Sequence, residues 1–118
     1  DMFIVSPSSL AARKSDWEKV VKVWYRVVDY LNDPKTQPEA ISIMAARVGL
    51  APEQYKPLLA GTKILTLEES KAVMTKAQGL QSVYGSSEVS DAFNVKYEIY
   101  KSPAPIDSYI DPSIIMGM

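Results

Sequence analysis

The residues SDWEKVVKVWYRVVDYLND, at 15–33, restrict the fold more than any other stretch, because their apolar side chains recur at helical spacing. Ser15 and Glu18 have the spacing of a capping box, in which each side chain pairs with a free N–H group of the first turn. Pro34 stops the pattern, since the residue before a proline avoids helical angles. We therefore predict a helix over about 16–32. Its broad apolar face contains Trp17, Val20, Val21, Trp24, Val27, Val28 and Leu31.

Caps and helix-ending residues indicate four further helices along the chain. The capping-box spacing recurs at Thr36 with Glu39 and again at Thr66 with Glu69. In the helix predicted at 37–48, Ile41, Met44, Ala45 and Val48 form the apolar stripe that should be buried, and Gly49 is placed to end this helix as a left-handed C′ residue. Each of these helices is amphipathic, so each has one face that must be covered by another part of a protein. The predicted ranges are about 37–48, 52–60, 67–77 and 86–100.

Extended segments are scarce in this sequence. The apolar run MFIV at 2–5 is typical of one short strand, and KIL at 63–65 is a second, weaker candidate. Residues 101–118 form a proline-interrupted tail with one short turn at about 106–109. A strand must share its N–H and C=O groups with a neighbour, yet these residues offer few neighbours. We therefore expect a mainly α chain with one or two short strands, whose helices cover a sheet formed mostly by residues outside it.

Composition excludes several classes of function. The chain contains no Cys and no His, which removes thiol nucleophiles, Cys/His zinc sites and histidine bases at once. Its 118 residues carry a net charge of −1 and are 47% hydrophobic, as expected for one globular domain or part of one. Scattered basic residues on a nearly neutral chain argue against nucleic-acid binding. The acidic pairs Glu68-Glu69 and Asp107 with Asp111 lack the further oxygen ligands of a cation site, so no metal is expected.

The order of segments resembles that of a known family. The run VVKVWYRVVDYLNDPKTQPEAISIMAARVGLAPEQYKPLLAGTKILTLEES is preceded by MFIVS and SSLAARKS, and it is followed by EVSDAF and IDPSII. This order is similar to the C-terminal part of periplasmic solute-binding proteins of ABC importers, of the nitrate/sulfonate/taurine type. The similarity covers nearly the whole chain, from Asp1 to about Ile115. It lies in the order and spacing of the segments rather than in any single motif.

The resemblance implies a fold larger than these residues. Members of the family have a two-lobed α/β structure of the type II periplasmic binding protein-like kind, with the solute in the cleft between the lobes. Residues 1–118 are then a single C-terminal segment of that fold, and the strand at 2–5 pairs with strands that lie upstream. A first residue Asp1, in place of Met, fits this expectation. Most residues that hold the solute also lie upstream.

The resemblance further implies a function in transport. The expected protein is the substrate-binding component of an ABC importer for a small anion or organic solute, such as nitrate, a sulfonate or taurine. It is not an enzyme and carries no cofactor. The implied partners are the N-terminal remainder of the same protein, the ABC permease and the solute, and exposed apolar surface also permits a homo-oligomer. The implied location is periplasmic or extracytoplasmic, at the membrane through the transporter.

Two residues are weak candidates for ligand binding. Thr62 and Lys63 lie between two predicted helices, and a lysine beside a hydroxyl suits an oxyanion through charge-assisted donors. The competing interpretation, a solvated loop pair, is the more common one for lysine. The aromatic residues Trp17, Trp24 and Tyr25 have helical spacing, which favours packing over ligand stacking.

Two other classes of function stay open at this point. The first is a free-standing helical module that binds a partner protein through its amphipathic faces. The second, weaker one is a thiamine-pyrimidine-synthase-like enzyme, whose chemistry depends on His or Cys in earlier lobes. No catalytic residue can be named for that enzyme here, because the chain has neither residue type.

Overall fold

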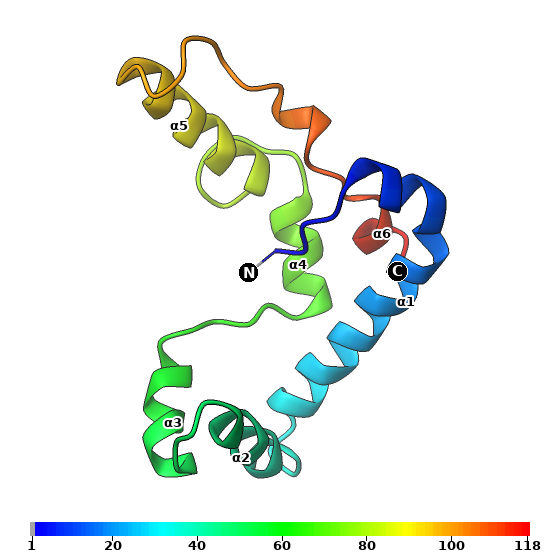
Figure 1. The fold of residues 1–118 in the computed structure, drawn as a ribbon, viewed down its shortest axis with the longest axis vertical. Helices are drawn as coiled ribbons and strands as arrows, with labels where there is room; N and C mark the ends of the chain where they lie inside the picture. Colours follow the sequence, from blue (N-terminus) through cyan, green and yellow to red (C-terminus); the bar gives the residue numbers. More distant parts are fainter. Residues whose placement is uncertain (1) are drawn as a thin grey trace. The chain divides into compact units, whose positions relative to one another are not determined.

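The computed structural model describes residues 2–118, which are mainly helical and contain no strand. The mainly α prediction is therefore confirmed, whereas a type II periplasmic binding protein-like fold stays a prediction. The chain forms two compact units that divide between Thr66 and Leu67. Figure 1 shows their helices in sequence colours.

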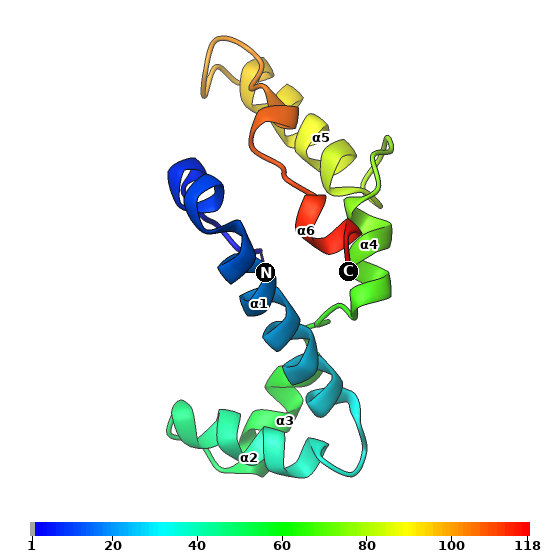
Figure 2. The ribbon, with the colours of Figure 1, turned by 90° about the vertical axis from the view of Figure 1, so that its right-hand side faces the viewer.

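The first unit contains three helices. They are α1 (Pro7–Asn32), α2 (Gln37–Arg47) and α3 (Pro52–Ala60). Helix α2 packs against both α1 and α3, as Figures 1 and 2 show. The predicted helical spacing of apolar residues is confirmed where these helices bury side chains, whereas Val20 and Val27 of the predicted apolar face of α1 are exposed. The buried residues of α1 and α2 are Val21, Tyr25, Val28, Leu31, Ala40, Ile41 and Ala45.

Helix α1 begins earlier than the predicted start at residue 16. Pro7 occupies its first turn, where a missing N–H group costs nothing, and the Ser6 hydroxyl accepts the Ser9 N–H at 3.2 Å as N-cap. Arg13 has non-helical angles of φ −135° and ψ 34°, so the helix is kinked there. The predicted helix is therefore the second part of α1, and a short first part precedes the kink.

The predicted capping box at Thr36 and Glu39 is wrong, although α2 begins where expected. Thr36 has no side-chain capping bond, because its hydroxyl donates to the backbone oxygen of Tyr30. The Glu39 carboxylate accepts the Tyr30 hydroxyl. Both side chains that the box requires are thus bound by the end of α1.

The predicted left-handed end of α2 is confirmed. Gly49 has φ +71°, its N–H group donates to Ala46, and the N–H group of Leu50 donates to Ala45 at 3.0 Å. These two bonds are those of a Schellman motif, which satisfies carbonyls at the end of a helix. The reversal lets α3 follow directly, over the predicted range 52–60.

The second unit contains three short helices and a 3₁₀ turn. They are α4 (Leu67–Met74), α5 (Val83–Lys96), the 3₁₀ helix η1 (Ile106–Ser108) and α6 (Ser113–Met116). Helix α4 packs against α5 and α6, and η1 packs against α5. The short turn expected near 106–109 is confirmed, whereas α6 was not predicted inside the tail.

Helix α4 ends before the predicted residue 77. The N–H group of Thr75 bonds to Ala72, three residues back, which tightens the last turn. The Ser82 hydroxyl donates to the Thr75 carbonyl at 2.8 Å. The Thr75 carbonyl therefore accepts a side-chain hydroxyl in place of the backbone N–H group that a further helical turn would supply.

Helix α5 is shifted toward the N-terminus relative to the predicted range 86–100. Ser82 is its N-cap and accepts the Tyr84 N–H at 3.2 Å. A Cβ atom on Gly85 would lie 2.3 Å from the backbone oxygen of Gly79, so only glycine permits this close contact between helix and loop. The helix ends because Glu98 adopts φ 57°, in the left-handed region.

The predicted strand at 2–5 is wrong for the described chain, and so is the weaker one at 63–65. A strand requires a hydrogen-bonded neighbour, and these two segments do not form a ladder with any part of residues 2–118. Met2 and Ile4 are instead exposed, at 75% and 91%. The sheet that such a strand was expected to join stays a prediction.

Candidate functional site

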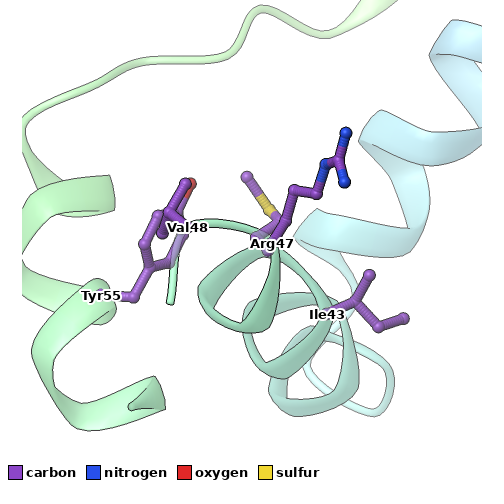
Figure 3. A pocket seen from close by; sticks show the side chains of 5 residues that line it. Ile43, Arg47, Val48 and Tyr55 are labelled. Carbon is purple, nitrogen blue, oxygen red and sulfur yellow. The ribbon is translucent and has the colours of Figure 1, made fainter. Parts of the chain in front are cut away.

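A shallow groove lies between α2 and α3 in the first unit (Figure 3). Its volume is about 480 Å³, and its lining side chains are mostly apolar. Tyr55 comes from α3, and the others come from α2 and its C-cap. The lining residues are Ile43, Met44, Arg47, Val48 and Tyr55.

The groove follows from how α2 distributes its apolar residues. Ile41 and Ala45 are buried, as the predicted stripe requires. Ile43 and Val48 lie outside that buried face and are 61% and 58% exposed. The predicted burial of Val48 is wrong, because this residue is the C-cap and no longer follows the helical direction.

The chemistry of the groove suits contact with an apolar group. Arg47 is its one charged lining residue, and no ion pair of Arg47 is present within residues 2–118. No carboxylate lines the groove beside it, and the hydroxyl that does so is the phenol of Tyr55. The arrangement therefore offers an apolar surface with a cation, and it lacks the paired groups of an acid–base site.

The structure places the predicted ligand residues elsewhere. Thr62 and Lys63 are exposed and lie between α3 and α4, outside the set of residues that line the groove. The N–H group of Thr62 donates to Leu59 at 2.9 Å and so closes α3. Their role in binding an oxyanion stays a prediction.

The aromatic residues of α1 take part in packing, as their spacing predicts. Tyr25 is buried, and Trp17 and Trp24 are half-buried. Trp24 meets the ring of Phe3 edge-on, with ring centroids 5.6 Å apart. This geometry is typical of aromatic packing between protein side chains.

A buried carboxylate organises the second unit. Asp91 on α5 accepts the Tyr100 hydroxyl at 2.8 Å and the Ala104 N–H at 2.7 Å. The hydrogen bond to Asp91 raises the pKa of Tyr100. These bonds hold the segment after α5 onto the helix, so Asp91 has a structural role that the sequence did not reveal.

An exposed ion pair joins the end of α4 to η1. Lys76 donates to both carboxylate oxygens of Asp107, at 2.7 and 2.8 Å, and lies 5.7 Å from the ring centre of Tyr84. The hydrogen bond to Asp107 raises the pKa of Lys76. Asp107, considered above as a possible metal ligand, is thus paired with a lysine.

Apolar side chains remain exposed along one side of α1 and along one side of α5. On α1 they form the α1 stripe, and their exposed fractions lie between 37% and 54%. Residues three or four apart share one side of a helix, so each set is continuous. The α1 stripe is Val20, Val23, Val27 and Tyr30, and the α5 stripe is Val89, Phe93 and Tyr97.

Within residues 2–118, no group of acidic side chains could hold a metal ion. None of the helices described above has the length and apolar character needed to cross a membrane.

No protein-family model, no curated protein and no solved structure matches the chain.

Proposed function

We propose that the chain is the C-terminal part of the substrate-binding component of an ABC importer. Such a protein closes two lobes around a small solute and delivers it to a membrane permease. The solute class proposed is a small anion or organic solute of the nitrate, sulfonate or taurine kind. In this proposal residues 2–118 supply helices that cover a lobe, and other residues supply most of the solute contacts.

The observation that carries the proposal is the amount of helical apolar surface that the described residues leave exposed. The α1 and α5 stripes lie on helices that also bury other side chains, so each helix has more apolar surface than its neighbours here cover. Exposed apolar surface of this extent is typical of a contact with further protein.

Solute binding is tested by thermal unfolding of the natural protein that contains this sequence. The panel is nitrate, bicarbonate, methanesulfonate and taurine, with chloride at equal ionic strength as the control. A ligand at 100 times its Kd stabilises the folded state by about 2.7 kcal/mol, which raises Tm by several degrees. The absence of a shift with every solute would contradict the proposal.

The weak ligand candidates are tested in the same assay. We expect Lys63→Gln to reduce the Tm shift if Lys63 contacts the solute, and Lys56→Gln, on exposed α3, to leave it unchanged. Equal shifts in both variants would remove Lys63 from the site while leaving solute binding intact.

A second function is favoured by the groove between α2 and α3. A helical module that binds a partner protein needs an exposed apolar surface, and Ile43 and Val48 provide one at this groove. The two proposals differ in what stabilises the natural protein, which is a small solute in the first and a polypeptide in the second.

A further inference from the structure

We propose that residues 2–12, which include the first turns of α1, form a strap that docks on the part of α1 after Arg13 and is released from it as one body. The strap precedes the kink at Arg13, whose φ of −135° interrupts the regular helix. From the start of α1 the chain returns toward the middle of the same helix, so that Phe3 reaches Trp24 (Figure 2). The interruption at Arg13 supplies the pivot that a continuous helix would lack.

Two side-chain contacts attach the strap to the main part of α1. The indole N–H of Trp17 donates to the hydroxyl of Ser9 at 3.1 Å. The ring of Phe3 lies edge-on to that of Trp24, at 87° between the ring planes. Trp17 and Trp24 are seven residues apart, two helical turns, so both contacts lie on the same side of α1.

The remainder of the strap is weakly held. Met2 and Ile4 are exposed at 75% and 91%, and Phe3 itself at 52%. Residues 2–5 form no backbone hydrogen bond with any part of the described chain. The hydrogen bonds of Ser6 are made within the strap, with the Ser8 hydroxyl and from the N–H groups of Ser9 and Leu10, so they move with it.

Docking therefore depends on one aromatic contact and one hydrogen bond, each of them weak in a half-exposed setting, together with the half-buried side chains of Val5 and Leu10. A state held by so few contacts exchanges with an open one, and removal of either contact shifts the population toward the open state. In the open state both indoles become accessible beside the α1 stripe. The segment 2–5 is then free to pair as a strand with another sheet edge.

Tryptophan fluorescence tests the strap directly, because the chain has only two tryptophans and both are contacts of the strap. Trp24→Phe leaves Trp17 as the sole reporter and keeps an aromatic ring for Phe3. Trp17→Phe leaves Trp24 as the sole reporter. Acrylamide quenching is measured in each background, and far-UV circular dichroism verifies that helix content is unchanged.

The decisive measurement is the effect of the Phe3 contact on the distant Trp17 in the Trp24→Phe background. Phe3→Ala is expected to raise the quenching constant of Trp17, which Phe3 does not touch, by roughly twofold as a half-buried ring becomes exposed. Trp17→Phe itself removes the indole donor to Ser9, so Ser9→Ala in that background should leave the quenching of Trp24 unchanged. Ile4→Ala, in the same segment but 91% exposed, is the matched control and should change neither reporter.

Two results would overturn the inference. If Phe3→Ala raises the quenching of Trp24 in the Trp17→Phe background but leaves that of Trp17 unchanged in the Trp24→Phe background, the contacts are independent and the strap does not move as a body. If Phe3→Ala changes the quenching of neither tryptophan, the strap is not docked. The inference does not depend on the proposed transport function, since the same measurement is informative for any function of the chain.

Discussion

Glu98 ends α5 in a conformation that usually belongs to glycine. It has φ 57°, and no other non-glycine residue within 2–118 has a positive φ. The N–H group of Glu98 donates to Val95 at 3.1 Å, and that of Ile99 donates to Asn94 at 2.9 Å. This is the same Schellman pattern that Gly49 forms after α2, so the chain contains the motif once with glycine and once without it.

The pair of motifs allows the effect of Glu98→Gly on the free energy of unfolding to be worked out. A left-handed conformation costs a residue with a Cβ atom about 1–2 kcal/mol. Glycine avoids that cost but loses about 0.4–1 kcal/mol through the greater freedom of its unfolded chain. The net stabilisation expected from Glu98→Gly is therefore about 0.5–1 kcal/mol. Gly49→Ala should destabilise by a similar amount, since no atom lies within 4 Å of the added Cβ.

Glu98→Ala is the control that separates charge from backbone. It retains the cost of the left-handed conformation and removes only the carboxylate, whose unfavourable interaction with the helix C-terminus is worth about 0.3–1 kcal/mol. The difference between the Gly and Ala variants isolates the backbone effect. Urea unfolding is followed by far-UV circular dichroism, because both tryptophans belong to the first unit and do not report on α5.

The sign of this difference can refute the reasoning. If the helix instead continued to residue 100, as the apolar spacing predicts, position 98 would lie inside it. Glycine there would be about 1 kcal/mol less stable than alanine. A Glu98→Gly variant that is less stable than Glu98→Ala would therefore contradict the left-handed end of α5.

Three further perturbations follow from the described contacts. Gly85→Ala should destabilise by about 2 kcal/mol or more, because the new Cβ meets backbone atoms that cannot rotate away, whereas Gly61→Ala, with no atom nearer than 3.5 Å, should be neutral in the same urea assay. The raised pKa of Tyr100 lies above its unfolded value, so its stabilisation is complete below about pH 10 and is lost as the pH rises through the folded value. Tyr100→Phe should flatten the alkaline loss of stability measured by circular dichroism, and an unchanged slope would exclude this bond as its cause. Hydrogen bonds from Arg13 and then from Lys19 lower the pKa of Asp16, so its stabilisation is present above the unfolded pKa and lost as the pH falls. Arg13→Gln should raise that pKa in a carboxyl NMR titration, and an unmoved pKa would argue against the pair.

The sequence predicted the bounds of a helix well where residues next to its ends determine where it starts and stops. Helix α3 has the predicted bounds, and α2 ends within one residue of its predicted end because Gly49 marks the turn. The start of α5 was missed, since it depends on a close contact between Gly85 and the loop at Ala77 and Gly79. The spacing of apolar residues does not indicate such a contact. Its end was missed because Glu98 gives no sign of a left-handed residue.

The candidate site was less predictable than the helices. A groove between α2 and α3 depends on how the two helices pack against each other. The apolar spacing within a single helix does not predict that packing. The apolar residues Ile43 and Val48 were the available signal, but helical spacing predicted Val48 on the buried face, and it is exposed. The polar contacts of Asp91 join α5 to a segment after it, and no motif spacing indicates such a pair.

The exposed α1 and α5 stripes also affect the colloidal behaviour of the chain when it is produced by itself. With 13 basic and 14 acidic residues its net charge is only −1, so long-range repulsion between molecules is feeble. Association between molecules then depends mainly on the apolar side chains of the stripes. Lowering the ionic strength, which strengthens charge repulsion, should therefore do little to prevent precipitation. Replacing Val23 by Glu, in the middle of the α1 stripe, adds charge and polarity at one position and should raise the soluble concentration measurably.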